Sequence, residues 1–164
     1  MKTLTLFRHA KSSWSDRTLS DRDRPLNQRG ERDAPAMGKL VVDSGVRPSL
    51  ILTSPATRAW QTATAVAREI GYPIEFLQRE EDLYLASLNT LMEVVAAHGS
   101  EFNHLMIVGH NPGLTEFANY LSPSLTGNLP TSGVVSVSFD KDDWSLRERP
   151  VSNLLVYDYP KKNR

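Results

Sequence analysis

The sequence predicts an α/β domain built around a largely parallel β-sheet. Short runs of branched apolar side chains, typical of buried strands, alternate along the chain with segments whose apolar residues recur every three or four positions, as in amphipathic helices. Three of the helical segments end at a glycine, the residue that most often terminates an α-helix. Strands that alternate with helices favour parallel strands joined by crossover helices.

The strand candidates are short apolar runs bounded by turn residues or charges. The four strongest are residues 3–7, 50–53, 105–109 and 134–139, and the two weaker ones are residues 74–77 and 153–157. The apolar stripes that predict helices are Ala34, Met37, Leu40 and Val41; Ala59, Ala63, Val66, Ala67 and Ile70; Leu88, Leu91, Met92 and Val95; and Leu114, Phe117, Ala118 and Leu121. The first three stripes are followed by Gly45, Gly71 and Gly99.

Size and composition bound the function. A chain of 164 residues and 18.4 kDa fits one domain, which we expect to span residues 1–164. The 19 Lys and Arg residues balance the 19 Asp and Glu residues, so no long-range positive field predicts binding to nucleic acid or to a membrane. The absence of cysteine excludes disulfides, thiolate metal sites and cysteine nucleophiles. The apolar stretch at the N-terminus is too short for a secretory signal or a membrane span, so we expect a cytoplasmic location.

Charged side chains follow the ends of three predicted strands. Arg8 and His9 follow the first strand, Arg58 comes shortly after the second, and His110 follows the third. In open α/β sheets the ligand crevice lies beyond the carboxyl ends of the parallel strands, so these side chains are expected to converge. Guanidinium groups are always charged and grip phosphate through paired N–H donors. The sequence therefore predicts a phosphate-binding pocket at this edge of the sheet.

Two predicted helix starts support an anion site. Ser54 before Pro55, and Asn111 before Pro112, each match an N-cap followed by proline at the first helical position. The N-terminus of a helix presents free N–H groups and a positive dipole end, which together favour a bound anion. His98 and His104 lie outside this pattern and are interpreted as structural residues.

Two polar connections are unusually long, residues 10–30 and 122–133. Connections of that length in a small domain are usually functional or mobile. On charge pattern alone, the first is best interpreted as a solvated loop with surface ion pairs. The second is consistent with a long turn.

The motifs at the three strand ends resemble those of the histidine phosphatase superfamily, in its phosphoglycerate-mutase-like branch. The resemblance is carried by Arg8-His9-Ala10, by Ser54-Pro55 with Arg58, Ala59, Thr62 and Ala63, and by Gly109-His110-Asn111. Chain length and Arg24-Pro25-Leu26 followed by Gly30 resemble the SixA-type phosphohistidine phosphatases in particular. The resemblance covers nearly the whole chain and implies a three-layer sandwich with a mostly parallel central sheet flanked by helices, phosphoglycerate-mutase-like in fold.

The resemblance also implies a role for each matching residue. His9 matches the nucleophile that becomes phosphorylated, Arg8 and Arg58 match the phosphate clamp, and His110 matches the second histidine at the transferring group. Phosphoryl transfer depends mainly on positioning and on positive charge around the phosphoryl oxygens, so these residue types suit the chemistry. We expect further substrate contacts from Lys11, Arg24 and Asn111, with no metal and no cofactor.

The chain departs from the family pattern in two places. Ala10 stands where the family commonly has glycine, which constrains the loop without removing a reactive group. The glutamate that serves mutases and phosphomonoesterases as general acid aligns near Tyr84 or Leu85, although Glu81 and Asp82 lie close by as alternatives. Imidazole, with a pKa of about 6.5, leaves far more easily than an alkoxide, so loss of the acid is tolerable for cleavage of phosphohistidine.

These observations favour a metal-independent phosphatase that forms a phosphohistidine intermediate on His9 and removes phosphate from phosphohistidine in a protein. The alternatives are a small-molecule phosphomonoesterase of the same superfamily and a non-catalytic phosphate-binding module. A metallohydrolase using His9 and His110 is disfavoured because no closely spaced set of ligands is present. The expected partner is a phosphorylated substrate, such as a protein that bears phosphohistidine, and the expected assembly is a monomer or a weak dimer.

Overall fold

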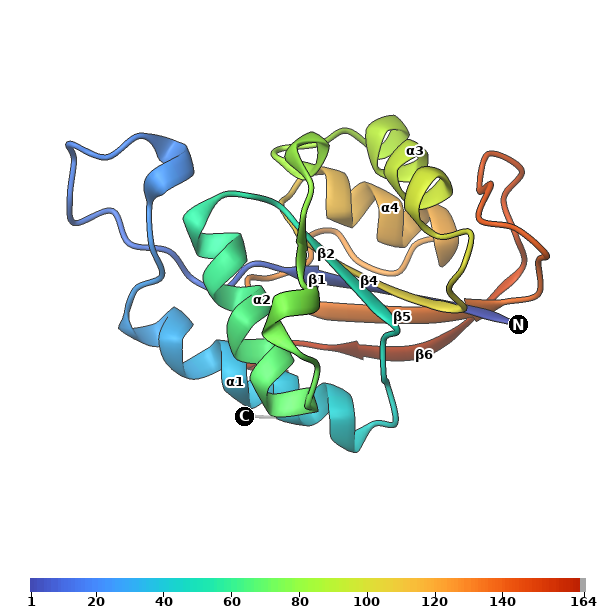
Figure 1. Ribbon diagram of the computed structural model, residues 1–164, viewed down its shortest axis with the longest axis horizontal. Coiled ribbons are helices and arrows are strands. Elements are labelled where there is room, and N and C mark those ends of the chain that lie inside the picture. Colours follow the sequence, from blue (N-terminus) through green and yellow to red (C-terminus); the bar gives the residue numbers. More distant parts are fainter. Residues whose placement is uncertain (163–164) are drawn as a thin grey trace.

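A computed structural model describes residues 1–162 and consists of a six-stranded sheet with helices on both faces (Figure 1). The strands are β1 (Lys2–Arg8), β2 (Leu50–Thr53), β3 (Gln78–Arg79), β4 (His104–Gly109), β5 (Val134–Phe139) and β6 (Ser152–Asp158). The α-helices are α1 (Gln28–Asp43), α2 (Thr57–Ile70), α3 (Leu88–His98) and α4 (Gly113–Leu121). Short 3₁₀ helices are η1 (Asp21–Asp23), η2 (Ile74–Phe76) and η3 (Glu81–Leu83).

The strands lie in the order β3-β2-β4-β1-β5-β6. The pairs β1–β4, β4–β2 and β2–β3 are parallel, whereas β5 runs antiparallel to both β1 and β6. The predicted α/β fold with a mostly parallel sheet is therefore confirmed. Among residues 1–162, none of the helices combines the length and the apolar character needed to cross a bilayer.

The core is divided by the sheet, because successive side chains of a strand point to opposite faces. On one face, Leu4 and Leu6 of β1 pack in a cluster with the buried side chains of α3 and α4. On the other face, Phe7 packs in a cluster with those of α1 and α2. Figure 1 shows these two helix pairs on opposite sides of the sheet. The three-layer arrangement follows from apolar strands that are covered on both faces.

One weak strand prediction is wrong and the other is confirmed. Residues 74–77 do not form a strand, because Pro73 starts a tight turn in which the amide of Phe76 donates to the Pro73 carbonyl, 3.0 Å away. The strand in this region, β3, begins at Gln78, one residue after the end of the predicted range. The candidate at residues 153–157 lies within β6.

The sheet brings the ends of β1, β2 and β4 together. β4 lies between the other two strands, with Gly109 opposite Arg8 and Val108 opposite Thr53. The residues that follow each strand therefore leave the sheet at one edge and at nearly the same height. This register places His9 beside His110 and brings the segment that leads into α2 next to both.

Candidate active site

A cavity of about 200 Å³ lies at the carboxyl ends of these strands. All seven residues expected at the site from the sequence line it: Arg8, His9, Lys11, Arg24, Arg58, His110 and Asn111. Its other lining residues are Ser12, Trp14, Leu85 and Thr131. The lining thus contains four cationic side chains and no carboxylate.

His9 is buried and its ring is fixed by the backbone. Its Nδ1 atom lies 2.7 Å from the carbonyl oxygen of Ala10, and because a carbonyl only accepts hydrogen bonds, Nδ1 carries the proton. Nε2 is therefore left with its lone pair. Burial, together with the nearby charges of His110, Arg58 and Arg8, lowers the pKa of His9 to about 3, against a hydrogen bond to Ala10 that raises it. At neutral pH His9 is a neutral imidazole with one defined tautomer.

His110 lies next to His9, with ring centroids 5.2 Å apart. Its Nε2 lies 2.7 Å from Oγ of Ser54, and its Nδ1 lies 3.5 Å from Nη2 of Arg58. A guanidinium only donates, so Nδ1 is the acceptor in this contact and Nε2 donates to Ser54. Burial and the charge of Arg58 lower the pKa of His110 to about 4, so this ring is also neutral at neutral pH.

Arg8 and Arg58 bring two guanidiniums to the pocket. Nη1 of Arg8 donates to the carbonyl of Leu129 at 3.0 Å, and burial and the charge of Arg58 lower the pKa of Arg8. Within the described chain, the Nε atoms of Arg8 and Arg58 are buried and make no hydrogen bond. Buried donors without partners are rare and destabilising. A basic cluster with spare donors suits an anion, and phosphate oxygens match the fork of a guanidinium.

Asp21 is a member of the site that the sequence did not predict. Arg58 donates through Nη1 to the Asp21 carbonyl at 2.6 Å and through Nη2 to its carboxylate at 3.0 Å. The same carboxylate accepts from the Tyr84 hydroxyl at 2.5 Å and from Arg24 at 3.1 Å. These bonds, that from Tyr84 above all, lower the pKa of Asp21 to about 2 although burial opposes the shift.

The interpretation of residues 10–30 as a solvated loop with surface ion pairs is confirmed for residues 14–21, which are exposed, and for the exposed pair of Arg22 with Glu81. It is wrong for the ion pairs of Asp21, because their partners Arg24 and Arg58 are buried. Asp21 and Arg24 form ion pairs that reach the wall of the pocket, and η1 contacts α2. The only feature of the sequence that pointed to Asp21 was the high density of charged residues in this loop. In Figure 1 this segment leaves β1 and loops out beside the N-terminal end of α2 before α1 begins.

The three residues expected to contact substrate differ in their surroundings. Lys11 is exposed at the pocket. Arg24 is buried and donates to Oγ of Ser12 at 2.7 Å as well as to Asp21. Asn111 uses its amide group elsewhere, since it donates to the Leu129 carbonyl and accepts from the hydroxyl of Thr115.

Both predicted helix starts are displaced. α2 begins at Thr57, with Ala56 in the N-cap position, and Ser54 instead accepts from the Ala56 amide at 3.2 Å and from His110. α4 begins at Gly113 with Pro112 in the N-cap position, while the Asn111 side chain accepts from the Thr115 amide in the first turn. Ser54 therefore contacts the site through His110, and Asn111 caps the first turn of α4, although both residues lie before the N-cap position.

The acidic segment after β3 lies outside the pocket. Glu81 forms an exposed ion pair with Arg22, and neither Glu81 nor Asp82 lines the cavity. Leu85, which follows this segment, is instead a lining residue. In the part of the chain that the structure describes, no group of three or more acidic or histidine side chains could hold a metal ion.

His98 and His104 make structural contacts. His98 pairs with Glu80 at 3.0 Å, and His104 lies 3.0 Å from the Thr5 hydroxyl. Neither lines the pocket.

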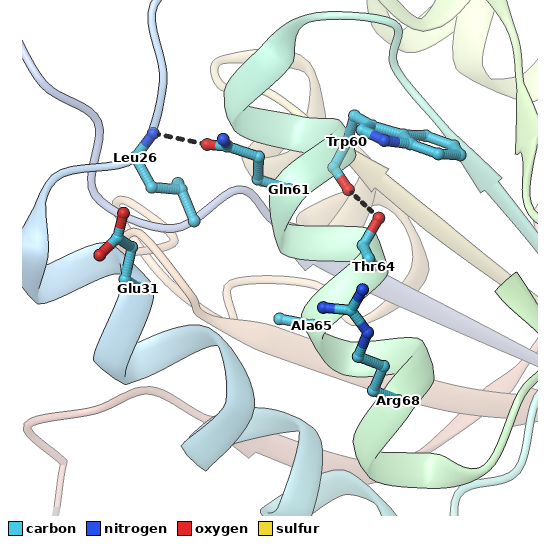
Figure 2. Close-up of a pocket in the computed structure, with 7 residues that line it drawn as sticks. All are labelled: Leu26, Glu31, Trp60, Gln61, Thr64, Ala65 and Arg68. Carbon is cyan, nitrogen blue, oxygen red and sulfur yellow. Dashed lines mark hydrogen bonds between the residues drawn. The ribbon is translucent and has the colours of Figure 1, made fainter.

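A larger groove of about 400 Å³ lies behind the loop that carries Leu26, between the start of α1 and the face of α2 (Figure 2). Gln61 accepts from the Leu26 amide at 2.9 Å and so fixes the end of the loop, while Thr64 donates to the carbonyl of Trp60. Glu31 and Arg68 lie on its walls. It contains none of the residues at the strand ends, so it is separate from the candidate active site.

The low pKa values of the buried histidines predict a distinctive response to acid. In NMR spectra of the histidine rings, we expect the signals of His9 and His110 to stay constant from pH 8 to pH 5, with His110 titrating near pH 4. The ring of His104, whose pKa burial lowers to about 4, is expected to behave in the same way.

The same shifts predict a loss of stability in acid. In the unfolded chain these rings regain a pKa of about 6.5, so below that pH the unfolded state binds protons that the folded state does not. The free energy of unfolding is therefore expected to fall between pH 6.5 and pH 4, by up to about 1.4 kcal/mol per pH unit for each ring. Urea unfolding at pH 7 and pH 5 measures the fall in the free energy of unfolding. In the NMR titration, a His9 ring with a midpoint near pH 6.5 would contradict the low pKa of this residue.

The chain is similar in sequence and in fold to several known proteins. Residues 4–106 match the model of the histidine phosphatase superfamily (branch 1). An uncharacterised chloroplastic protein of Arabidopsis thaliana is 33% identical over 74% of this chain and 59% of its own length. An uncharacterised protein of Mycobacterium tuberculosis is 33% identical over 78% of this chain and 84% of its own length.

A solved structure extends the match to nearly the whole chain. The crystal structure of the proposed phosphohistidine phosphatase SixA from Agrobacterium tumefaciens superposes with a TM-score of 0.80 at 30% identity, covering 97% of this chain and 98% of that one. The family model and this solved structure agree on the family of the chain. The chain therefore belongs to the histidine phosphatase superfamily, and within it to the SixA type.

Proposed function

We propose that this protein is a metal-independent phosphatase that removes phosphate from phosphohistidine in proteins through a phosphohistidine intermediate on His9. The observation that carries the proposal is the state of His9: a buried, neutral imidazole whose Nδ1 proton is held by the Ala10 carbonyl, in a pocket with two guanidiniums. Nε2 is then the nucleophile. A nucleophile that needs no deprotonation suits a pocket whose lining contains no carboxylate to act as base.

In the first step Nε2 of His9 attacks phosphorus while the bond between phosphorus and the leaving nitrogen breaks. Arg8 and Arg58 bind the phosphoryl oxygens, on which the negative charge is spread in the transition state. His110 lies beside them, and a phosphoryl dianion at this place would raise its pKa and favour its charged, donating form. In the second step water attacks the phosphorus, the bond to His9 breaks, and inorganic phosphate leaves.

The leaving group explains the preferred substrate. No carboxylate lines the pocket, and Glu81 is engaged with Arg22 outside it. An alkoxide leaving from a phosphomonoester is strongly basic and needs a proton from the enzyme. An imidazole ring that carries a proton on its other nitrogen leaves as a neutral molecule without that help. The lining of the pocket therefore supports cleavage of a phosphorus–nitrogen bond.

Brief incubation with a ³²P-labelled phosphohistidine peptide tests both parts of the proposal. The expected result is a protein-bound label that is lost in acid, survives alkali and maps to His9. A label on serine, or turnover of an alkyl phosphate much faster than of the peptide, would overturn the mechanism or the preferred substrate respectively.

A further inference from the structure

Two exposed apolar side chains stand at the rim of the pocket. Most large apolar side chains of the protein are buried, yet Trp14 is 70% exposed and Leu85 is 52% exposed. Both line the same cavity as His9 and the two guanidiniums. Single exposed apolar residues are common on protein surfaces, but two that flank a basic pocket form an apolar entrance to it.

The indole of Trp14 is held in place. The central carbon of the Arg24 guanidinium lies 3.4 Å from the centre of the indole ring, at cation–π distance. Arg24 is itself fixed, because it is buried and donates to Ser12 at 2.7 Å and to Asp21 at 3.1 Å. The ring thus rests on a rigid support and keeps most of its surface exposed. A flat side chain that is already ordered loses little entropy when a ligand stacks on it.

The backbone at Leu85 has an unusual, left-handed conformation. Its φ angle of +48° lies in the left-handed region, which residues with a Cβ atom rarely adopt. The side chain that occupies this position is exposed instead of filling the core. Strained residues of this kind gather at functional sites, where the backbone places a side chain against a ligand.

From these observations we propose that Trp14 and Leu85 determine specificity by contacting the leaving group, and that they select a flat ring, the imidazole of a phosphohistidine side chain. This inference rests on the proposed function. With the phosphoryl group bound by Arg8 and Arg58, we expect the leaving group to lie toward the exposed lining residues Trp14 and Leu85. An imidazole gains there from stacking on the indole and from contact with the isobutyl group, whereas a leaving group without a ring gains neither.

Two donors that are both cleaved at a phosphorus–nitrogen bond test this contact: a phosphohistidine peptide, whose leaving group is a ring, and phosphoramidate, whose leaving group has none. The measured quantity is the ratio of kcat/KM for the peptide to kcat/KM for phosphoramidate. Trp14→Ala is expected to lower this ratio about tenfold, the loss of roughly one stacked ring, and Trp14→Phe to restore most of it. Leu85→Gly removes the side chain while keeping a residue that tolerates the positive φ, and is expected to lower the ratio about fivefold, in keeping with the loss of one apolar contact.

Leu19→Ala provides the matched control, since Leu19 is an exposed apolar residue in the same loop that does not line the pocket. Its ratio is expected to equal that of the unmodified protein. Equal losses on both donors in Trp14→Ala, or an unchanged ratio in both rim variants, would overturn the inference and leave the proposed function standing. Absence of turnover of both donors by the unmodified protein would overturn the proposed function, and this inference with it.

Discussion

Replacing His9 with alanine is expected to lower kcat for a phosphohistidine peptide by about 10,000-fold or more and to abolish the labelled intermediate. The variant lacks the atom to which the phosphoryl group is transferred, and no neighbouring group can replace it. His110 is the nearest imidazole, but its Nε2 donates to Ser54 and its Nδ1 faces Arg58. Loss of a nucleophile commonly removes almost all of the covalent catalysis. Single-turnover assays with the labelled peptide measure the effect.

His98→Ala is the matched control, because His98 is a partly buried histidine that pairs with Glu80 and does not line the pocket. Its kcat is expected to stay within about twofold of the unmodified protein, as is usual for substitutions away from a site. Thermal unfolding of both variants separates a chemical effect from a loss of structure. Retention of a tenth or more of the turnover by a folded His9→Ala protein would eliminate the covalent route. Phosphate binding without any turnover in the unmodified protein would instead indicate a phosphate-binding module.

The part of the site that could be predicted follows from the sheet. Arg8 and His110 are about a hundred positions apart in the sequence, yet each follows a strand whose apolar character is plain. Parallel neighbouring strands bring their carboxyl ends to one edge, so a correct assignment of β1, β2 and β4 was enough to bring these residues together. Strand identity depends on side chains that are near in sequence, and such patterns can be read without the structure.

The part that could not be predicted depends on contacts made by a loop. Asp21 lies 37 positions from Arg58 and 63 from Tyr84, in a segment without apolar periodicity. Its place is fixed by the path that residues 10–27 take, and this path is held by such tertiary contacts as the bond from the Leu26 amide to Gln61. Dependence on tertiary contacts also explains why α2 begins later than predicted. Ser54 has the side chain of a good N-cap, but its hydroxyl is engaged by His110, which no local pattern reveals.

Asp21 also changes what is expected of Arg58. The guanidinium holds the Asp21 carboxylate and carbonyl with Nη2 and Nη1, while its Nε has no partner within the described residues. A bound phosphoryl group therefore meets a guanidinium whose orientation is already set by the loop. This pre-positioning is a property of the folded pocket, because Arg58 is buried and only 3% exposed. Replacing Arg58 should then lower kcat/KM, whether the variant loses the positive charge or only the paired donors of the guanidinium.

Arg58→Ala is expected to lower kcat/KM about 1,000-fold, since one positioned donor or arginine at a transition-state oxygen contributes about that much. Arg58→Lys keeps the charge but cannot offer paired donors or hold Asp21 in the same way, and is expected to lose about 100-fold. Asp21→Asn, which leaves Arg58 in place and weakens its orientation, is expected to lose about tenfold, as commonly seen for groups that orient a functional side chain.

Arg68→Ala is the control on the same helix, because Arg68 lies in α2 near its opposite end and does not line the pocket. From the largest loss to the smallest, the variants should therefore rank in the order Arg58→Ala, Arg58→Lys, Asp21→Asn and Arg68→Ala. The loss in the Arg58 variants is expected mainly in kcat, because the charge that the guanidinium stabilises is greatest in the transition state. An equal loss in Arg58→Ala and Arg68→Ala, with both proteins folded, would show that the phosphoryl group is not held by the guanidinium in the pocket.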